Sequence, residues 1–193
     1  VPLSIDTSKA EVARQALEAG ASLVNDVTAL QNDPEMATVV ARSKAALILM
    51  HMAGTPRTMQ KRPRYSNVVQ EVVRFLAQAA RRAEQVGIQR ARLLVDPGLG
   101  FGKTVAHNLE LMRHLDRLVS VGFPVVVGPS RKSFIGNTLS LDVQDRLAGT
   151  LACVAYAQRA NVHMVRVHDV QPTVHCIRML HAIETSHATR RQR

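Results

Sequence analysis

Short apolar segments alternate with longer amphipathic segments along all 193 residues of the chain. The apolar segments show little polar alternation, as expected for strands that are buried on both faces of a parallel sheet. The longer segments repeat apolar residues every three to four positions, which is typical of helices that cover such a sheet. The pattern predicts strands at 1–6, 21–26, 45–52, 91–96, 123–128 and 162–167, and helices at about 8–20, 34–43, 66–87, 106–121, 142–159 and 171–183.

One serine and two glycines mark expected helix ends. Ser8 precedes the first amphipathic segment, and a hydroxyl at that place commonly accepts a hydrogen bond from a free amide of the first turn, so we expect an N-cap. Gly20 and Gly87 follow the first and third helical segments, where glycine suits the left-handed conformation that ends many helices.

The six strand–helix units fit two architectures, an open doubly wound sheet and a (β/α)8 barrel. An open sheet uses only the strand ends at its crevice, whereas a barrel brings all strand ends to one mouth. Every strand here ends in polar or special residues: "SIDTS", "LVNDV", "LMHMAG", "LVDPG", "GPSRKS" and "VRVHD". This pattern favours an α/β fold of the (β/α)8 TIM-barrel type.

Six units leave such a barrel two units short. We expect the other two to precede Val1, so that residues 1–185 form units three to eight of an incomplete barrel. The final stretch, 186–193, ends in "TRRQR" and is expected to be a disordered basic tail.

The composition indicates an ordinary soluble domain, with 46% hydrophobic and 21% charged residues. No apolar run approaches a membrane span and no signal peptide opens the chain, so we expect a cytoplasmic location and no membrane partner. Cys153 and Cys176 lie in apolar segments and are interpreted as reduced core residues. The net charge of +10 raises the possibility of a nucleic-acid partner. The basic residues are dispersed, however, and the four Phe and two Tyr are not interleaved with them as a base-stacking surface would require. A nucleic-acid partner is therefore not expected.

The glycine-rich stretch "LLVDPGLGFGKT", residues 93–104, resembles two nucleotide-binding loops without matching either. A P-loop requires glycine where this chain has Pro97, and the spacing of Gly98, Gly100 and Gly102 fails the dinucleotide pattern. The carboxylate of Asp96 at the strand exit would also repel a polyphosphate. The stretch is therefore interpreted as a loop for a ligand that is rich in N–H donors.

One shared mouth would bring three kinds of side chain together. Hydrogen-bond acceptors suit a planar heterocycle, basic groups suit a phosphate or diphosphate, and apolar side chains supply walls. The acceptors are Asp6, Asn25 and Asp96; the basic groups are Arg131, Lys132, Arg166 and His168; the walls are Met50, Met52, Phe101 and Phe134.

Several of these residues have an alternative role. Asp6 could instead cap a helix, and either Asn25 or Asp26 could face the mouth while the other forms a turn. Arg166 and His168 lie on the same side of their strand, which favours joint anion binding. The spacing of histidines and cysteines does not fit a zinc site.

Six motifs occur in order along the chain: "SIDTSK", "VNDV", "LMHMAGTPRTMQ", "LLVDPGLGFGK", "SRKSFIG" and "RVHDV". Together they resemble the dihydropteroate synthase family, the folate-pathway transferases that sulfonamides inhibit, and the resemblance extends to about Ile183. That family's barrel has two further units at its N-terminus, which carry mobile loops that help to bind metal and diphosphate. The resemblance therefore implies Mg²⁺ as cofactor, with no metal ligand in this chain, and a homodimer when complete.

The resemblance also implies roles for individual residues. Asp6, Asn25, Asp96 and Lys132 match pterin-pocket residues, with Asp6, Asp96 and Lys132 as catalytic groups. Met50 or Met52 and Phe101 match the pocket walls, and Lys103 lies near the pocket. Arg166 and His168 match the diphosphate anchors, while Ser130, Arg131 and Phe134 lie on the loop that receives p-aminobenzoate.

The implied reaction joins 6-hydroxymethyl-7,8-dihydropterin diphosphate to p-aminobenzoate and releases diphosphate. Two alternatives are a pterin-dependent methyltransferase and a truncated, non-catalytic pterin-binding fragment. Methyl transfer involves no diphosphate, so "SRKSFIG" with "RVHD" favours the synthase.

Overall fold

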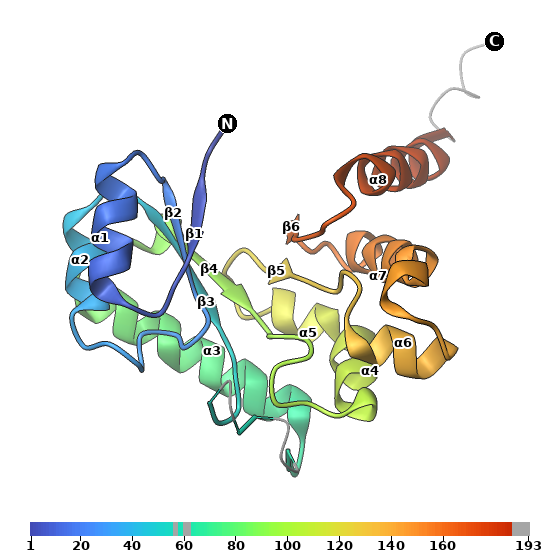
Figure 1. Ribbon diagram of the computed structural model, residues 1–193, viewed down its shortest axis with the longest axis horizontal. Helices are drawn as coiled ribbons and strands as arrows, with labels where there is room; N and C mark the ends of the chain where they lie inside the picture. The colour runs from blue at the N-terminus through green and yellow to red at the C-terminus, as the bar shows by residue number, and fades with distance from the viewer. Residues whose placement is uncertain (56–57, 60–62, 187–193) are drawn as a thin grey trace.

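The computed structural model describes residues 1–55, 58–59 and 63–186. Its described part contains six parallel strands in two sheets, ordered β1-β2-β3-β4 and β5-β6, and a bridge between Val95 and Val125 joins the two sheets. The strands are therefore in sequence order along one curved row (Figure 1). Their bounds are Ser4–Asp6 (β1), Leu23–Asp26 (β2), Ala46–Met50 (β3), Leu93–Asp96 (β4), Val126–Val127 (β5) and Met164–Val165 (β6).

Helices follow the strands and lie along the outside of this row (Figure 1). They are α1 Ala10–Glu18, α2 Met36–Arg42, α3 Val68–Gln85, α4 Val105–Arg113, α5 Leu115–Val119, α6 Ser133–Leu139, α7 Leu147–Arg159 and α8 Val170–Thr185. Two short 3-10 helices, η1 Arg90–Arg92 and η2 Val143–Asp145, precede β4 and α7. The strand–helix alternation agrees with the predicted pattern.

One part of the core lies between the four-stranded sheet and the long helix α3. Leu47 and Leu49 of β3 are fully buried, as are Val72 and Leu76 on the inner face of α3. Burying a side chain of this size contributes about 1.5–3 kcal/mol. This packing supports β3 and β4, whose carboxyl ends face the mouth.

Helix α1 begins differently from the prediction. Its N-cap residue is Lys9, and Ser8 does not cap it. The amide of Ala10 donates instead to Asp33 Oδ2 at 2.8 Å, so a carboxylate from the next unit takes the place of the expected hydroxyl. Gly20 and Gly87 do follow their helices with φ of +103° and +92°, which confirms the predicted helix ends.

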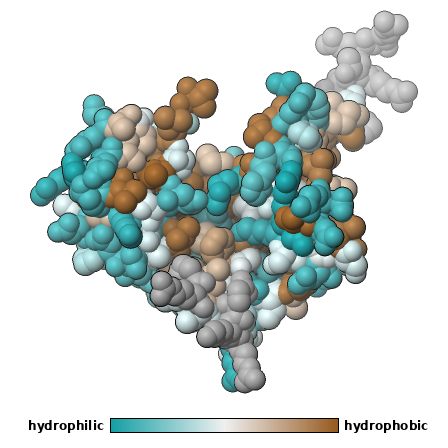
Figure 2. All heavy atoms as spheres, viewed as in Figure 1, coloured by the Kyte–Doolittle hydropathy of each residue, from teal (hydrophilic) through white to brown (hydrophobic). Residues whose placement is uncertain are grey.

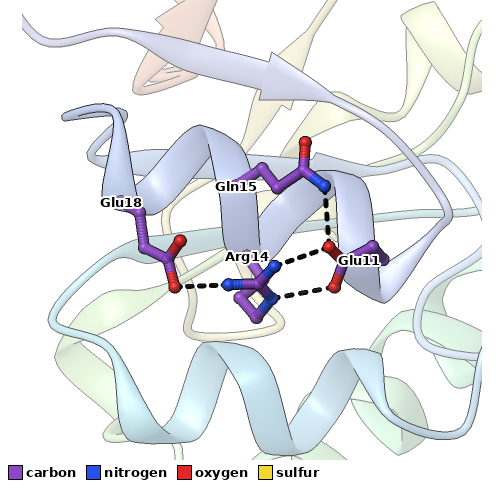
Figure 3. A network of polar contacts seen from close by, with 4 residues as sticks. All are labelled: Glu11, Arg14, Gln15 and Glu18. Atoms are coloured by element: carbon purple, nitrogen blue, oxygen red, sulfur yellow. Dashed lines mark hydrogen bonds and ion pairs between the residues drawn. The ribbon is translucent and has the colours of Figure 1, made fainter.

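The exposed face of α1 carries a small ion-pair network (Figure 3). Arg14 bonds Glu11 and Glu18, and Gln15 donates to Glu11 at 2.7 Å. These bonds to Arg14 and Gln15 lower the pKa of Glu11 to about 2. Solvent screens such pairs strongly, so they contribute to the solubility of the surface more than to stability.

The second half of the chain departs further from the predicted elements. The predicted helix at 106–121 breaks at His114, whose φ of −112° and ψ of 37° separate α4 from α5. Helix α6 lies in a segment for which no helix was predicted, and α7 begins at Leu147, later than expected. Strands β5 and β6 have two residues each.

No described helix is both long and apolar enough to cross a membrane. Cys153 and Cys176 are free thiols and only half-buried, so the expectation of core positions was too strong. Burial raises the pKa of the Cys153 thiol to about 11. Helix α8 extends to Thr185, and all but the first residue of the predicted tail at 186–193 lies outside the described residues.

Figure 2 shows the molecule hollowed between its N-terminal and C-terminal arms. Within the described residues, β1 pairs only with β2 and β6 only with β5, so each has one free edge. Apolar side chains are exposed near both edges, including Leu3, which is 60% exposed, and Val170, which is 62% exposed. The row of strands is therefore open in the residues described here.

Candidate functional site

Polar side chains stand at the carboxyl ends of the strands, as predicted. Asp6 and Asp96 are the last residues of β1 and β4, and Asn25 is the penultimate residue of β2. Asp6 accepts a hydrogen bond from the Asn25 amide nitrogen, and its other oxygen lies 3.4 Å from Arg166 Nη2. This chain of contacts joins the first strand to the last across the mouth.

Asn25 and Asp26 have different roles, which resolves the alternative left open by the sequence. Asp26 accepts hydrogen bonds from the amide and hydroxyl of Thr28 and from the amide of Leu30, so it stabilises its own loop. Asn25 faces Asp6, is 4% exposed, and its amide oxygen has no hydrogen-bond partner. A buried acceptor without a donor is costly, which makes this oxygen a candidate for binding a ligand N–H.

Asp96 is a buried carboxylate at the start of the glycine-rich loop. It is 6% exposed, and its Oδ1 accepts the amide of Gly98 at 2.7 Å. Burial raises the pKa of the Asp96 carboxyl, while the positive charge of Lys132 opposes that shift. Gly98 has a φ of +65°, and a Cβ at this position would overlap the carbonyl oxygen of His51, so only glycine fits.

Lys103 holds the glycine-rich loop through hydrogen bonds to its carbonyl groups. Its ammonium is 2.9 Å from His51 Nδ1 and donates to the carbonyls of Gly98 at 3.0 Å and Phe101 at 2.9 Å. Burial lowers the pKa of Lys103 to about 7, and burial together with Lys103 lowers that of His51 to about 3. Lys103 therefore serves the shape of the loop, which also agrees with the conclusion that the loop does not hold a triphosphate.

Lys132 and the apolar walls stand on the other side of the loop. Lys132 Nζ donates to the carbonyl of Leu99 and lies 4.5 Å from the ring centre of Phe101. Burial lowers the pKa of Lys132 to about 8, which leaves it mostly charged near neutral pH. Met50 is buried and Met52 is half-buried at the end of β3, so both can serve as walls.

The basic groups of the last strand line a hollow of about 140 Å³ together with Lys132 and Ser130. Arg166 is held by its backbone amide, which donates to Val127 at 2.9 Å, and its side chain is 56% exposed. His168 Nδ1 lies 2.8 Å from the hydroxyl oxygen of Ser130. The structure thus brings together Arg166 and His168, the two residues predicted to hold an anion.

Arg131 and Phe134 do not reach this hollow. Arg131 forms a bidentate pair with Asp169 at 2.9 and 2.5 Å, and its carbonyl accepts a bond from Arg146. Phe134 is 2% exposed and packs in the hydrophobic core, with its edge on a separate hollow of about 230 Å³ at the starts of α4 and α6. In the described conformation Arg131 orients the loop instead of meeting an anion.

Three supporting residues were missed or underestimated by the sequence reasoning. His51, which the sequence analysis did not single out, is 6% exposed and contacts Lys103. Asp169 fixes Arg131, and Thr150 accepts the Arg131 amide at 3.0 Å. Of these, only Asp169 had a signal in the sequence, because it follows His168 directly in "RVHDV".

The comparison with known proteins now decides the family. The model for the pterin binding enzyme family matches residues 1–168. This chain belongs to the pterin-binding enzyme family. It is 42% identical over 180 residues to the dihydropteroate synthase of Escherichia coli K12, an alignment that covers 93% of this chain and 64% of that protein.

Two further members of the pterin-binding family are informative. The chain is 43% identical over 187 residues to inactive dihydropteroate synthase 2 of Mycobacterium leprae, covering 94% of this chain and 64% of that protein. It is 41% identical to a solved dihydropteroate synthase from Xanthomonas albilineans in complex with 7,8-dihydropteroate, with a TM-score of 0.90 over 96% of this chain and 69% of that chain.

These likenesses confirm the predicted resemblance and fold class. The six strands and their helices form part of the (β/α)8 TIM barrel of pterin-binding enzymes. This chain spans less than two thirds of the length of the two curated relatives named above.

Proposed function

We propose that this chain carries the pterin-recognition and diphosphate-recognition elements of a dihydropteroate synthase. The reaction condenses 6-hydroxymethyl-7,8-dihydropterin diphosphate with p-aminobenzoate and releases diphosphate. The observation that carries the proposal is the buried, unpaired amide oxygen of Asn25, a residue that bonds Asp6, which in turn contacts Arg166.

Pterin recognition follows from the hydrogen-bonding capacity of the acceptors. A pterin ring presents a ring N–H beside an exocyclic amine, and an ionised carboxylate accepts two parallel bonds of that kind. Asp96 offers such a carboxylate, and the Asn25 oxygen offers a further acceptor. Phe101 and Met50 would hold the faces of the ring.

The anionic tail of the substrate would lie in the hollow lined by Arg166, His168 and Lys132. As the carbon–oxygen bond breaks, negative charge develops on the leaving diphosphate and positive charge on the pterin methylene. The three basic groups stabilise the first, and Asp6 and Asp96 stabilise the second. The aniline nitrogen of p-aminobenzoate then attacks the methylene, so no covalent enzyme intermediate is required.

Magnesium was expected from the family resemblance. Among the described residues no three His, Cys, Asp or Glu side chains come together in a way that could hold a metal ion. Mg²⁺ therefore stays a prediction from the resemblance, and the steps proposed for this chain use its own side chains. The homodimer and the cytoplasmic location stay predictions.

A second candidate function is pterin binding without turnover. It is favoured by the 43% identity to a relative that is named an inactive dihydropteroate synthase. A pterin-dependent methyltransferase is disfavoured, because the basic hollow has no use in methyl transfer.

The test is to measure binding and turnover separately on the same preparation. Isothermal titration with 6-hydroxymethyl-7,8-dihydropterin diphosphate reports binding, and chromatographic detection of 7,8-dihydropteroate after addition of p-aminobenzoate reports turnover. Both results together support the synthase, and binding alone supports the second candidate. No binding of the pterin, by a chain that melts cooperatively, would overturn both.

A further inference from the structure

Ser130 makes two contacts with one residue, His168. Its hydroxyl is buried at 7% exposure, in the loop that follows β5. The hydroxyl oxygen accepts the backbone amide of His168 at 3.1 Å and lies 2.8 Å from His168 Nδ1. The histidine therefore engages this hydroxyl in the described structure, while the predicted substrate-binding role of Ser130 stays a prediction.

The available protons bear on the direction of the hydrogen bond between the Ser130 hydroxyl and His168 Nδ1. The amide of His168 can only donate, so it takes one lone pair of the Ser130 oxygen. The hydroxyl proton then needs an acceptor of its own, and Nδ1 is the acceptor within reach. The oxygen keeps a second lone pair, so the contact fits either tautomer; when the hydroxyl donates, Nδ1 is unprotonated and the proton of the neutral imidazole is on Nε2.

We propose that Ser130 is a positioning residue that fixes His168 in this tautomer, so that Nε2–H donates to an anion in the hollow. This deepens the proposed function and rests on it, because the anion is the diphosphate of the substrate. With the opposite tautomer, Nε2 would turn a lone pair toward the phosphate oxygens and repel them. His168 lines the hollow beside Arg166, whose guanidinium supplies charge, while the imidazole supplies a directed donor.

His163 provides an internal reference for the measurement on His168. Its Nδ1 accepts the backbone amide of Val125 at 3.2 Å, which also fixes the proton on Nε2. That contact does not involve Ser130. A change at Ser130 should therefore alter the signals of His168 and leave those of His163 unchanged.

The tautomer can be read directly by nitrogen-15 NMR. Long-range ¹⁵N–¹H spectra are recorded at a pH about two units above 6.5, the ordinary histidine pKa, with His168 assigned from a His168→Gln variant. In the wild type, both His168 and His163 should show an unprotonated Nδ1. In Ser130→Ala, His168 should shift toward a mixture of tautomers, and Ser130→Thr, which retains a hydroxyl, should restore the wild-type pattern.

Binding of inorganic diphosphate, measured by calorimetry, tests the consequence. Ser130→Ala should weaken it by about 3- to 10-fold, the range expected for one net hydrogen bond, and Ser130→Thr should stay within about 2-fold of the wild type. Thermal melting verifies that each variant folds.

Three outcomes would overturn parts of the proposal in distinguishable ways. An unchanged His168 spectrum in a folded Ser130→Ala protein overturns the positioning role. A changed tautomer with unchanged diphosphate affinity overturns the link to anion binding. If the wild-type chain binds no diphosphate, the proposed function of the hollow is wrong. The nitrogen-15 spectrum of His168 still shows, independently of binding, whether Ser130 fixes the tautomer.

Discussion

The two sides of the mouth are built in opposite ways. The acceptor side, Asp6, Asn25 and Asp96, belongs to the four-stranded sheet, and its two inner members are only 4% and 6% exposed. The basic side, Lys132, Arg166 and His168, belongs to the two-stranded sheet and its loops, and the Arg166 side chain is 56% exposed. On the acceptor side Asn25 and Asp96 are enclosed while Asp6 is half-exposed; on the basic side Arg166 and His168 are open to solvent while Lys132 is partly buried.

This difference suits the two parts of the proposed substrate. A flat ring presents donors at fixed positions, so buried and rigid acceptors recognise it well and reject rings that leave an acceptor unpaired. A diphosphate has many equivalent oxygens and must leave after the reaction. Exposed, solvated charges attract it without holding it too tightly.

The largest effect is expected on stability, from a substitution that removes the support of the glycine-rich loop beside Asp96. Lys103→Met deletes the ammonium that donates to the Gly98 and Phe101 carbonyls. Each carbonyl left unpaired costs about 1–3 kcal/mol, so the free energy of unfolding should fall by roughly 2–6 kcal/mol. Urea denaturation followed by circular dichroism measures it, with the exposed Lys9→Met as the matched control.

The same variant predicts a pH dependence. The folded-state pKa of Lys103 is about 7, below the ordinary value of about 10.4 for lysine. Between these two values the unfolded chain binds more protons, so the contribution of Lys103 to stability rises with pH. The stability difference between wild type and Lys103→Met should therefore widen from pH 7 toward pH 10. A difference that narrows over this range would contradict the lowered pKa.

Asp96→Asn should have the next largest effect, now on affinity. The amide retains one accepting oxygen but presents an NH₂ to a ligand donor, which leaves a buried donor unpaired at a cost of about 1–3 kcal/mol. Affinity for 6-hydroxymethyl-7,8-dihydropterin should fall roughly 5- to 150-fold in calorimetry. Any turnover should lose kcat as well, because charge stabilisation matters most in the transition state.

Asp26→Asn is the matched control for Asp96→Asn. Asp26 is 1% exposed and also ends a strand, but its contacts are to its own loop at Thr28 and Leu30. Its replacement should lower the melting temperature and leave pterin affinity nearly unchanged. If Asp26→Asn lost pterin affinity and Asp96→Asn did not, the pterin would be bound by Asp26, and the assignment of Asp96 would be wrong.

The acceptor side was largely predictable from the sequence and the basic side less so. Asp6, Asn25 and Asp96 directly end apolar runs, so the strand pattern alone places them at the mouth. Which of Asn25 and Asp26 faces inward depends on bonds from Thr28 and Leu30 that no periodicity reveals. The pairing of Arg131 with Asp169, 38 positions away, is a tertiary contact that the sequence pattern does not reveal. The burial of Phe134 was likewise not foreseen, because α6 was not predicted and that helix packs the ring in the core.

On the basic side, Arg166→Ala should act selectively. In the proposed complex the guanidinium contacts the substrate only through phosphate oxygens, and solvent reduces the strength of these charge-assisted bonds because the side chain is exposed. Affinity for the pterin diphosphate should fall by about 10-fold, while affinity for the free hydroxymethyl pterin should stay within about 2-fold. Calorimetry with the two ligands measures the ratio, and Arg159→Ala, at a 74% exposed side chain elsewhere, controls for net charge. Equal losses for both ligands would assign Arg166 to the pterin site.

The smallest effect concerns the contact that joins the two sides. Asp6 Oδ2 lies 3.4 Å from Arg166 Nη2, and the two side chains are 51% and 56% exposed. An ion pair this exposed contributes about 0.2–1 kcal/mol, and salt weakens it further. A double-mutant cycle of Asp6→Asn and Arg166→Gln, followed by urea denaturation, should therefore give a coupling free energy below about 1 kcal/mol that decreases between low and high salt. Such a value means that the acceptor side keeps its form when the diphosphate arrives or leaves, because Arg166 can exchange Asp6 for the anion at little cost. A coupling well above that range, insensitive to salt, would show instead that the two sides act as one rigid unit.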